Sequence, residues 1–233
     1  MKCSIVIPNY NQGHLLHRSV QSAINQTLPS SDFEIVIVDD GSKDNSLLIA
    51  QGIISANPKH NIKLVKKQNG GTASARNAGI ANSSGEYIGF LDADDEYHIQ
   101  KAEISIKYLE TSDEIGLVYS DYFEIKGDSV FYTSKPDFEL AKLRQSCIVS
   151  TNSFIKRSVV NSVGTLNESL KIIEDYEYWL RICTSGFFAM RIPAGLFKYY
   201  VHGENKTLTS SQEQIFSEHR DVLGAYRQWM KTQ

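Results

Sequence analysis

YIGFLDADD, at residues 87–95, is a short apolar run that leads directly into the carboxylates of Asp92, Asp94 and Asp95. Short, nearly continuous apolar runs are typical of strands buried on both faces of a parallel sheet. Earlier stretches have the same character, at residues 3–7, 34–38 and 62–66. We therefore expect the first part of the chain to supply buried strands whose ends carry polar residues.

The intervals between these runs have the spacing of helices. Apolar or small residues recur every three or four positions within residues 16–24, 47–54 and 72–81. Strands and helices that alternate at this rhythm predict an α/β fold with an open, doubly wound and mostly parallel sheet. In such a sheet ligands bind beyond the carboxyl ends of the strands, where the strand order reverses.

The second half of the chain is less regular. Short strands are expected at residues 116–119, 122–125, 130–133, 187–192 and 196–201. Helices are expected at residues 139–146, 156–163 and 175–184. Because no repeat or linker interrupts the pattern, we expect one compact domain.

Residues 210–231 are amphipathic, with apolar residues at helical spacing against charged ones. A helix that packs on its own domain is the first interpretation. A contact between two copies of the chain, or docking on a membrane surface, stays open. The mixed charges of the segment do not form the cationic face of a strong membrane binder.

The composition is that of a globular protein, with 41% hydrophobic and 22% charged residues. The net charge of −3 gives no basic surface for a nucleic-acid backbone. Cys3, Cys147 and Cys183 are far apart and are expected to be reduced, mostly buried thiols. With neither a signal-peptide pattern nor an apolar run of membrane-spanning length, we expect a cytoplasmic protein, and peripheral contact with the inner face of the membrane stays open.

Polar residues follow the first two strands. Tyr10, in the segment PNYN at residues 8–11, can stack on a nucleobase or simply cover the core in a turn. Asp40, in the segment DDGS at residues 39–42, can accept hydrogen bonds from a base or a ribose, although this segment is also a common turn. Each signal is weak alone.

Residues 69–77, NGGTASARN, place glycines and a hydroxyl residue before a helix. Gly70 and its neighbours could form an anion site at the helix N-terminus, and Arg76 could reach a phosphate. The segment fits neither the P-loop nor the GxGxxG pattern. A flexible glycine-rich turn with a solvated arginine is the alternative.

The acidic run after residue 91 is the strongest signal for chemistry. Carboxylates this close repel one another and raise one another's pKa unless a cation lies between them. Hard oxygen ligands suit Mg²⁺ or Mn²⁺, which typically completes its shell with substrate phosphate oxygens. Asp92 and Asp94 point the same way if the segment is extended, so both could face one ion directly or through water. A charged turn that caps the next helix is the alternative.

Taken together, these segments resemble family 2 glycosyltransferases of the GT-A fold, over roughly residues 3–205. The resemblance rests on PNYN at 8–11, VDDGS at 38–42, ARNAG at 75–79, GEYI at 85–88 and LDADD at 91–95, in this order. It implies that residues 1–98 form the nucleotide-sugar-binding half, residues 99–208 a smaller acceptor-side half, and residues 209–233 a C-terminal helix.

The resemblance also implies roles for individual residues. Tyr10 corresponds to the aromatic that stacks on the base, Asp40 to the carboxylate that reads the edge of the base, and Asp92 and Asp94 to the Asp-x-Asp element. That element holds the metal on the donor diphosphate and contacts the ribose, with Asp94 as the first choice for direct metal contact. The full set of predicted donor-binding residues is Pro8, Tyr10, Asn11, Asp40, Gly70, Arg76 and Asp92.

Further along the chain, EDYEYWLR at residues 174–181 resembles the family's acceptor-side pattern. Its Asp175 corresponds to the catalytic base, and Glu174, Glu177 and Trp179 are expected on the acceptor side. Either glutamate could instead be the base if the helix register differs. The family often has GGFD where residues 164–167 read GTLN, which leaves the local turn in doubt.

A late segment, at residues 199–202, resembles the family pattern Tyr-Arg-x-His, with Tyr200 where arginine is frequent. His202 could approach the diphosphate or the metal, or be structural. The expected function is inverting transfer of a hexose-type sugar from a nucleoside diphosphate donor, by default a UDP-sugar, to a hydroxyl of a glycan or lipid-linked acceptor, with Mn²⁺ or Mg²⁺. A binding protein without turnover and a sugar nucleotidyltransferase are the alternatives.

Overall fold

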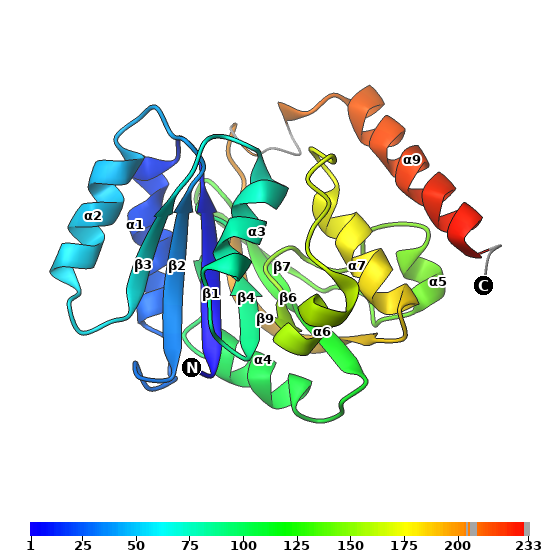
Figure 1. The fold of residues 1–233 in the computed structure, drawn as a ribbon, viewed down its shortest axis with the longest axis horizontal. Helices are drawn as coiled ribbons and strands as arrows, with labels where there is room; N and C mark the ends of the chain where they lie inside the picture. Colours follow the sequence, from blue (N-terminus) through cyan, green and yellow to red (C-terminus); the bar gives the residue numbers. More distant parts are fainter. Residues whose placement is uncertain (204, 206–208, 231–233) are drawn as a thin grey trace.

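The computed structural model describes residues 1–203, 205 and 209–230, with side chains up to residue 226. Within that part of the chain nine strands form one sheet, in the order β3-β2-β1-β4-β8-β6-β9-β5, with β7 paired to β6 (Figure 1). Helices cover both faces of this sheet. None of the described helices is long and apolar enough to cross a lipid bilayer.

The first four strands are parallel, as the apolar runs predicted. They are β1 (Cys3–Asn9), β2 (Phe33–Asp39), β3 (Ile62–Lys66) and β4 (Tyr87–Phe90). Every residue of β1, β2 and β4 is buried. The expectation of full burial is wrong for β3, because it is the outer strand of the sheet and its residues are half-buried or exposed.

The helices between these strands are α1 (Gly13–Ile24), α2 (Ser46–Ala56) and α3 (Thr72–Ala81). Helix α3 packs directly on β1, since a Cβ atom at Gly79 would lie only 2.2 Å from Cγ1 of Val6. The small residues of α3 thus permit the close approach that brings its N-terminus to the ends of β1 and β2. The larger core clusters lie on opposite faces of the sheet: Ile5 and Ile7 belong to one, and Val6 to the other.

The second half extends the sheet with strands of mixed direction. Its elements are β5 (Glu96–Tyr97), α4 (Lys101–Leu109), β6 (Ile115–Lys126), β7 (Ser129–Thr133), α5 (Leu140–Leu143), β8 (Phe154–Lys156), α6 (Arg157–Val163), α7 (Glu174–Thr184) and β9 (Phe188–Tyr200). Strand β8 runs antiparallel to both β4 and β6, whereas β6 and β9 are parallel. Because β8 is antiparallel to β4, the start of β8 lies beside the end of β4. The loop before β8 therefore lies beside the acidic segment that follows β4.

Several expectations for this half are wrong, and the helix expected at residues 139–146 spans only Leu140–Leu143. The pairs of short strands expected at 116–125 and 187–201 are single long strands, β6 and β9. Their pairing register shifts at Ser120 and Asp121, and such bulges let a strand continue through an irregular stretch. Strand β8 was not expected, because its three residues are too few to show a period.

The C-terminal helix α9 (Gln212–Met230) lies beside α7 in Figure 1. Val222 is buried with one core cluster, and Leu223 and Tyr226 pack against it, so the helix packs on its own domain as expected. The side chains of Trp229 and Met230, which contributed to the expected apolar face, lie outside the described residues. Contact with a second copy or with a membrane stays a prediction.

Candidate active site

A cavity of about 820 Å³ opens at the carboxyl ends of β1, β2 and β4. Residues from strand ends far apart in the sequence meet in its wall, as expected for a doubly wound sheet. Those predicted from the sequence are Pro8, Tyr10, Asp40, Arg76, Asp92, Asp94, Glu174 and Asp175.

The segment after β1 supplies one edge of the cavity. Tyr10 is 43% exposed there, so its ring is accessible to a planar ligand. Asn11 has a positive φ of 55° and is not among the described lining residues. Its side-chain oxygen accepts from the Lys43 backbone N–H at 2.7 Å, and its own N–H donates to Oγ of Ser42. Asn11 therefore ties together the turns that follow β1 and β2.

Asp40 lines the cavity and organises the glycine loop. Its buried carboxylate accepts hydrogen bonds from the backbone N–H groups of Gly70 at 3.0 Å and Gly71 at 2.8 Å, and from Nζ of Lys67 at 2.6 Å. Gly71 has a φ of 92°, a conformation that favours glycine. A Cβ atom at Gly70 would lie 2.7 Å from Oγ of Ser74. Contact between Asp40 and a nucleobase stays a prediction.

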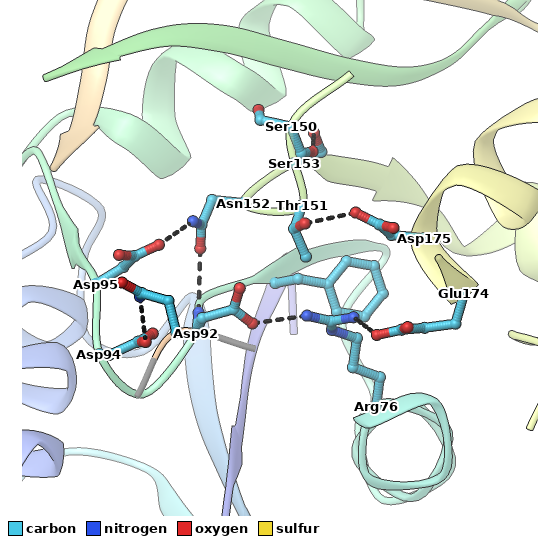
Figure 2. Close-up of polar contacts among 12 residues, drawn as sticks. Arg76, Asp92, Asp94, Asp95, Ser150, Thr151, Asn152, Ser153, Glu174 and Asp175 are labelled. Atoms are coloured by element: carbon cyan, nitrogen blue, oxygen red, sulfur yellow. Dashed lines mark hydrogen bonds and ion pairs between the residues drawn. The ribbon is translucent and has the colours of Figure 1, made fainter. Parts of the chain in front are cut away.

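Arg76 lines the cavity and is only 3% exposed, so it is not a solvated arginine, and its contact with a phosphate stays a prediction. Its guanidinium donates to Oδ1 of Asp92 at 2.7 Å and to Oε1 of Glu174 at 3.0 Å (Figure 2). Burial alone would lower the pKa of Arg76, but the carboxylates of Asp92, Glu174 and Asp175 outweigh it and raise the pKa above its ordinary value. Arg76 therefore links the acidic loop to the N-terminus of α7.

The carboxylates after β4 are crowded, as the sequence indicated. Burial, reinforced by the charge of Asp92, raises the pKa of Asp94 above its ordinary value. Burial and the charges of Asp94 and Asp92 raise the pKa of Asp95 even more strongly. Oδ2 of Asp94 lies 3.0 Å from Nε2 of His202, and a role of His202 at the metal or the diphosphate stays a prediction. A cation beside Asp92 and Asp94 would relieve this repulsion.

These residues could supply only part of the coordination shell of a divalent ion. Asp92 and Asp94 offer hard oxygen donors to the cavity. In the described part of the chain, no group of three or more His, Cys, Asp or Glu side chains is arranged to hold a metal. An ion bound here would therefore take much of its shell from diphosphate oxygens and water, which is how Mg²⁺ is commonly bound.

Helix α7 brings Asp175 to the other side of the cavity. Oδ2 of Asp175 accepts from the Thr151 hydroxyl at 2.6 Å, and Oδ1 accepts from the Tyr176 N–H at 2.8 Å. The carboxylate lies in the first turn of the helix, where the helix dipole favours negative charge. Glu174, one residue earlier, is only 3% exposed and is held by Arg76.

The described wall includes neither Glu177 nor Trp179, so the structure does not bring these two predicted acceptor-side residues to the cavity. Trp179 lies one helical turn beyond Asp175, deeper in the core, where it packs against Phe90. Glu177 pairs with Arg181 at 2.8 Å on another face of the helix. Neither side chain is in a position to receive a proton from a ligand in the cavity.

Sequence reasoning missed several residues of the site. Thr151, Asn205, Ile215 and His219 line the cavity, and Asn152 supports the acidic loop. The polar run STNS at residues 150–153, directly before an apolar strand, is the signal that could have revealed Thr151 and Asn152. It follows the same rule of polar residues at strand ends that revealed the acidic segment.

Helix α9 closes one side of the cavity. The Glu218 carboxylate accepts from the backbone N–H groups of Lys171, Ile172 and Ile173, at 2.9, 3.0 and 3.2 Å. The His219 ring stacks on Tyr176 with centroids 5.1 Å apart. Glu218 thus binds the segment before α7, and α9 contributes Ile215 and His219 to the wall beside Asp175.

Comparison with known proteins gives a consistent result. Residues 4–164 match the profile of the family described as Glycosyl transferase family 2. An uncharacterized glycosyltransferase of Rickettsia prowazekii (strain Madrid E) is 31% identical over 236 residues, which cover 96% of this chain and 70% of that protein.

Solved structures share the fold. The crystal structure of S. aureus TarS 1-349 in complex with UDP-GlcNAc has a TM-score of 0.79 at 21% identity, over 97% of this chain and 66% of that one. The mannosyltransferase PcManGT from Pyrobaculum calidifontis, in complex with GDP-Man and Mn²⁺, has a TM-score of 0.72 at 18% identity, over 88% of this chain and 58% of that one. The GT-A fold expected from the sequence is thereby confirmed.

Proposed function

Because the chain belongs to glycosyltransferase family 2, we propose that its cavity binds a nucleoside diphosphate sugar and transfers the sugar to an acceptor hydroxyl. The donor we propose is a UDP-hexose or a related UDP-sugar, and the acceptor a glycan or a lipid-linked saccharide. The observation that carries the proposal is that Asp92, Asp94 and Asp175, from separate segments of the chain, line one cavity (Figure 2).

The donor lies, in this proposal, along the ends of β1, β2 and β4. Tyr10 stacks on the base and Asp40 accepts from its edge, while the diphosphate lies at Asp92 and Asp94. UDP-GlcNAc in the complex of TarS supports a uridine donor, and the GDP-Man complex of PcManGT supports a related site for another nucleotide. The cavity volume of about 820 Å³ is ample for a nucleotide sugar.

A divalent ion, Mn²⁺ or Mg²⁺, would be held by Asp94 together with Asp92, with His202 beside it. When bound, it neutralises charge that develops on the departing diphosphate. Burial and the charge of Asp92 raise the pKa of Asp94, and this unfavourable placement of a carboxylate supports a cation here. Mn²⁺ in the PcManGT complex is consistent with this choice.

Asp175 is the proposed general base. As the acceptor oxygen forms its bond to the anomeric carbon, its proton moves to the Asp175 carboxylate, and the bond from that carbon to the diphosphate oxygen breaks. Asp175 lines the cavity and keeps acceptor capacity, because a carboxylate has about four lone-pair sites and its hydrogen bonds with Thr151 and Tyr176 use only part of them.

The alternative functions lack a comparable observation. A binding protein without turnover does not need a carboxylate opposite the metal site, yet Asp175 is held at the cavity by Thr151. A sugar nucleotidyltransferase uses a basic, glycine-rich loop after its first strand, whereas here β1 ends in the segment PNYN at residues 8–11. Glycosyl transfer therefore remains the better proposal.

The proposal predicts inversion at the anomeric carbon. One base opposite the leaving group leads to direct in-line attack, without a covalent intermediate on the protein. The anomeric proton coupling of the first-formed product, recorded by NMR with an α-linked UDP-sugar donor, is expected to be that of a β-glycoside. A product that keeps the α configuration would contradict the assignment of Asp175 as the base for direct attack.

A further inference from the structure

The turn at residues 150–153 joins the two acidic sides of the cavity (Figure 2). On one side, Nδ2 of Asn152 donates to Oδ2 of Asp95 at 2.5 Å, and its Oδ1 accepts from the Asp92 N–H at 3.1 Å. On the other side, the neighbouring Thr151 donates its hydroxyl proton to Asp175 at 2.6 Å. Adjacent residues of one turn therefore hold the acidic loop and the proposed base.

This turn has little freedom to move. Asn152 and Ser153 are 2% and 0% exposed, and the Ser153 hydroxyl donates to the Ser150 carbonyl. The Phe90 N–H donates to the Ser153 carbonyl at 3.1 Å, and Phe154 then pairs with Gly89 in the sheet. The turn is thus anchored on β4, the strand that leads into Asp92 and Asp94.

The Asp175 carboxylate, in contrast, depends on few contacts. Its hydrogen bonds come from Thr151 and from the N–H of the following residue, Tyr176. Within the part of the chain that the structure describes, the bond from Thr151 is the one that comes from outside α7. Without that bond, the side chain keeps its helix and the nearby charge of Arg76, but loses the hydrogen bond that orients it toward the turn beside the acidic loop.

On the basis of the proposed function, we propose that Thr151 is a positioning residue for transfer. Its hydroxyl fixes the orientation of the Asp175 carboxylate relative to the metal-bound leaving group, through a turn that Asn152 fastens to the acidic loop. Thr151 keeps its own proton, and the acceptor proton goes to Asp175. In-line attack requires such alignment, and a misplacement of about 1 Å can reduce the rate about 100-fold.

Paired substitutions separate this role from simple packing. Thr151→Val removes the hydroxyl and keeps the shape of the side chain, whereas Thr151→Ser keeps the hydroxyl and removes a methyl group. We expect Thr151→Val to lower kcat by about 10- to 100-fold, with donor KM and the affinity for UDP and Mn²⁺ unchanged. Thr151→Ser is expected to keep most of the wild-type kcat.

The wild-type chain is assayed first, by release of UDP from a UDP-sugar in the presence of acceptor and Mn²⁺. If the wild-type chain releases no UDP under any condition, the proposed function fails. If it is active and Thr151→Val has the same kcat, or if the Val and Ser variants are equally impaired, the proposed function stands and the positioning role of Thr151 is refuted.

Discussion

Asp175→Asn is expected to lower kcat for sugar transfer by about 100- to 10,000-fold, the range typical of a lost general base. The amide has nearly the same shape but cannot take up the acceptor proton. Donor binding is expected to change little, because the residues proposed to contact the metal and the nucleobase, Asp94 and Tyr10, belong to other segments of the cavity wall than Asp175. The measurement is steady-state release of nucleoside diphosphate, with and without acceptor.

Glu177→Gln is the matched control, since it removes a carboxylate from the same helix. Glu177 pairs with Arg181 and is outside the described cavity wall. Its substitution is therefore expected to leave kcat within a few-fold of wild type. If Glu177→Gln abolished transfer while Asp175→Asn did not, the base would be wrongly assigned. Glu174, held by Arg76, is the other carboxylate to compare.

Asp94→Asn is expected to abolish the gain in donor affinity that Mn²⁺ provides. A metal ion that joins the Asp94 carboxylate to the diphosphate adds binding free energy, and each 1.4 kcal/mol corresponds to a tenfold change in affinity. We therefore expect UDP to bind at least about tenfold more weakly in the presence of Mn²⁺, measured by isothermal titration calorimetry. UDP binding without metal should be nearly unchanged.

The fold is expected to survive this substitution. Burial and the charge of Asp92 raise the pKa of Asp94 in the folded protein, so ionised Asp94 opposes folding at pH values above that raised pKa. This cost vanishes as the pH falls and the group is protonated, and the uncharged amide removes it at neutral pH. Thermal unfolding at pH 7 should therefore show little loss of stability.

Asp128→Asn, in the exposed turn between β6 and β7, is the charge-matched control for Asp94. It should leave the effect of Mn²⁺ on UDP affinity unchanged. If Asp94→Asn kept the full effect of Mn²⁺, the metal would have to be held elsewhere.

The sequence predicted those strands and helices whose burial in the fold is reflected directly in their pattern of apolar residues. Buried strands such as β1 and β4 are apolar because both faces are covered, so their sequences show it directly. Strands β6 and β9 could not be predicted at full length, because bulges in their pairing break the local pattern while the sheet continues. Strand β8 is defined by its neighbours rather than by its three residues.

In the site, too, some residues could be predicted from local sequence and others could not. The carboxylates of Asp92 and Asp94 could be predicted because they directly follow a recognisable strand. Two other features of the site join residues that are far apart in the sequence. They are the hydrogen bond between Thr151 and Asp175 and the hydrogen bonds of Glu218 with the segment before α7. No local sequence pattern predicts such contacts. Trp179 was predicted on the acceptor side but is buried in the core, because the packing of α7 decides which of its side chains are buried.

The central claim is that one cavity binds a nucleoside diphosphate through a divalent ion at Asp94, facing Asp175. Anomalous X-ray scattering from crystals grown with UDP and Mn²⁺ tests it most directly. We expect an anomalous peak within bonding distance of the Asp94 carboxylate and the UDP diphosphate, with the uracil at Tyr10. Bound UDP with no manganese beside Asp94, or with its diphosphate outside the cavity between Asp94 and Asp175, would contradict the claim.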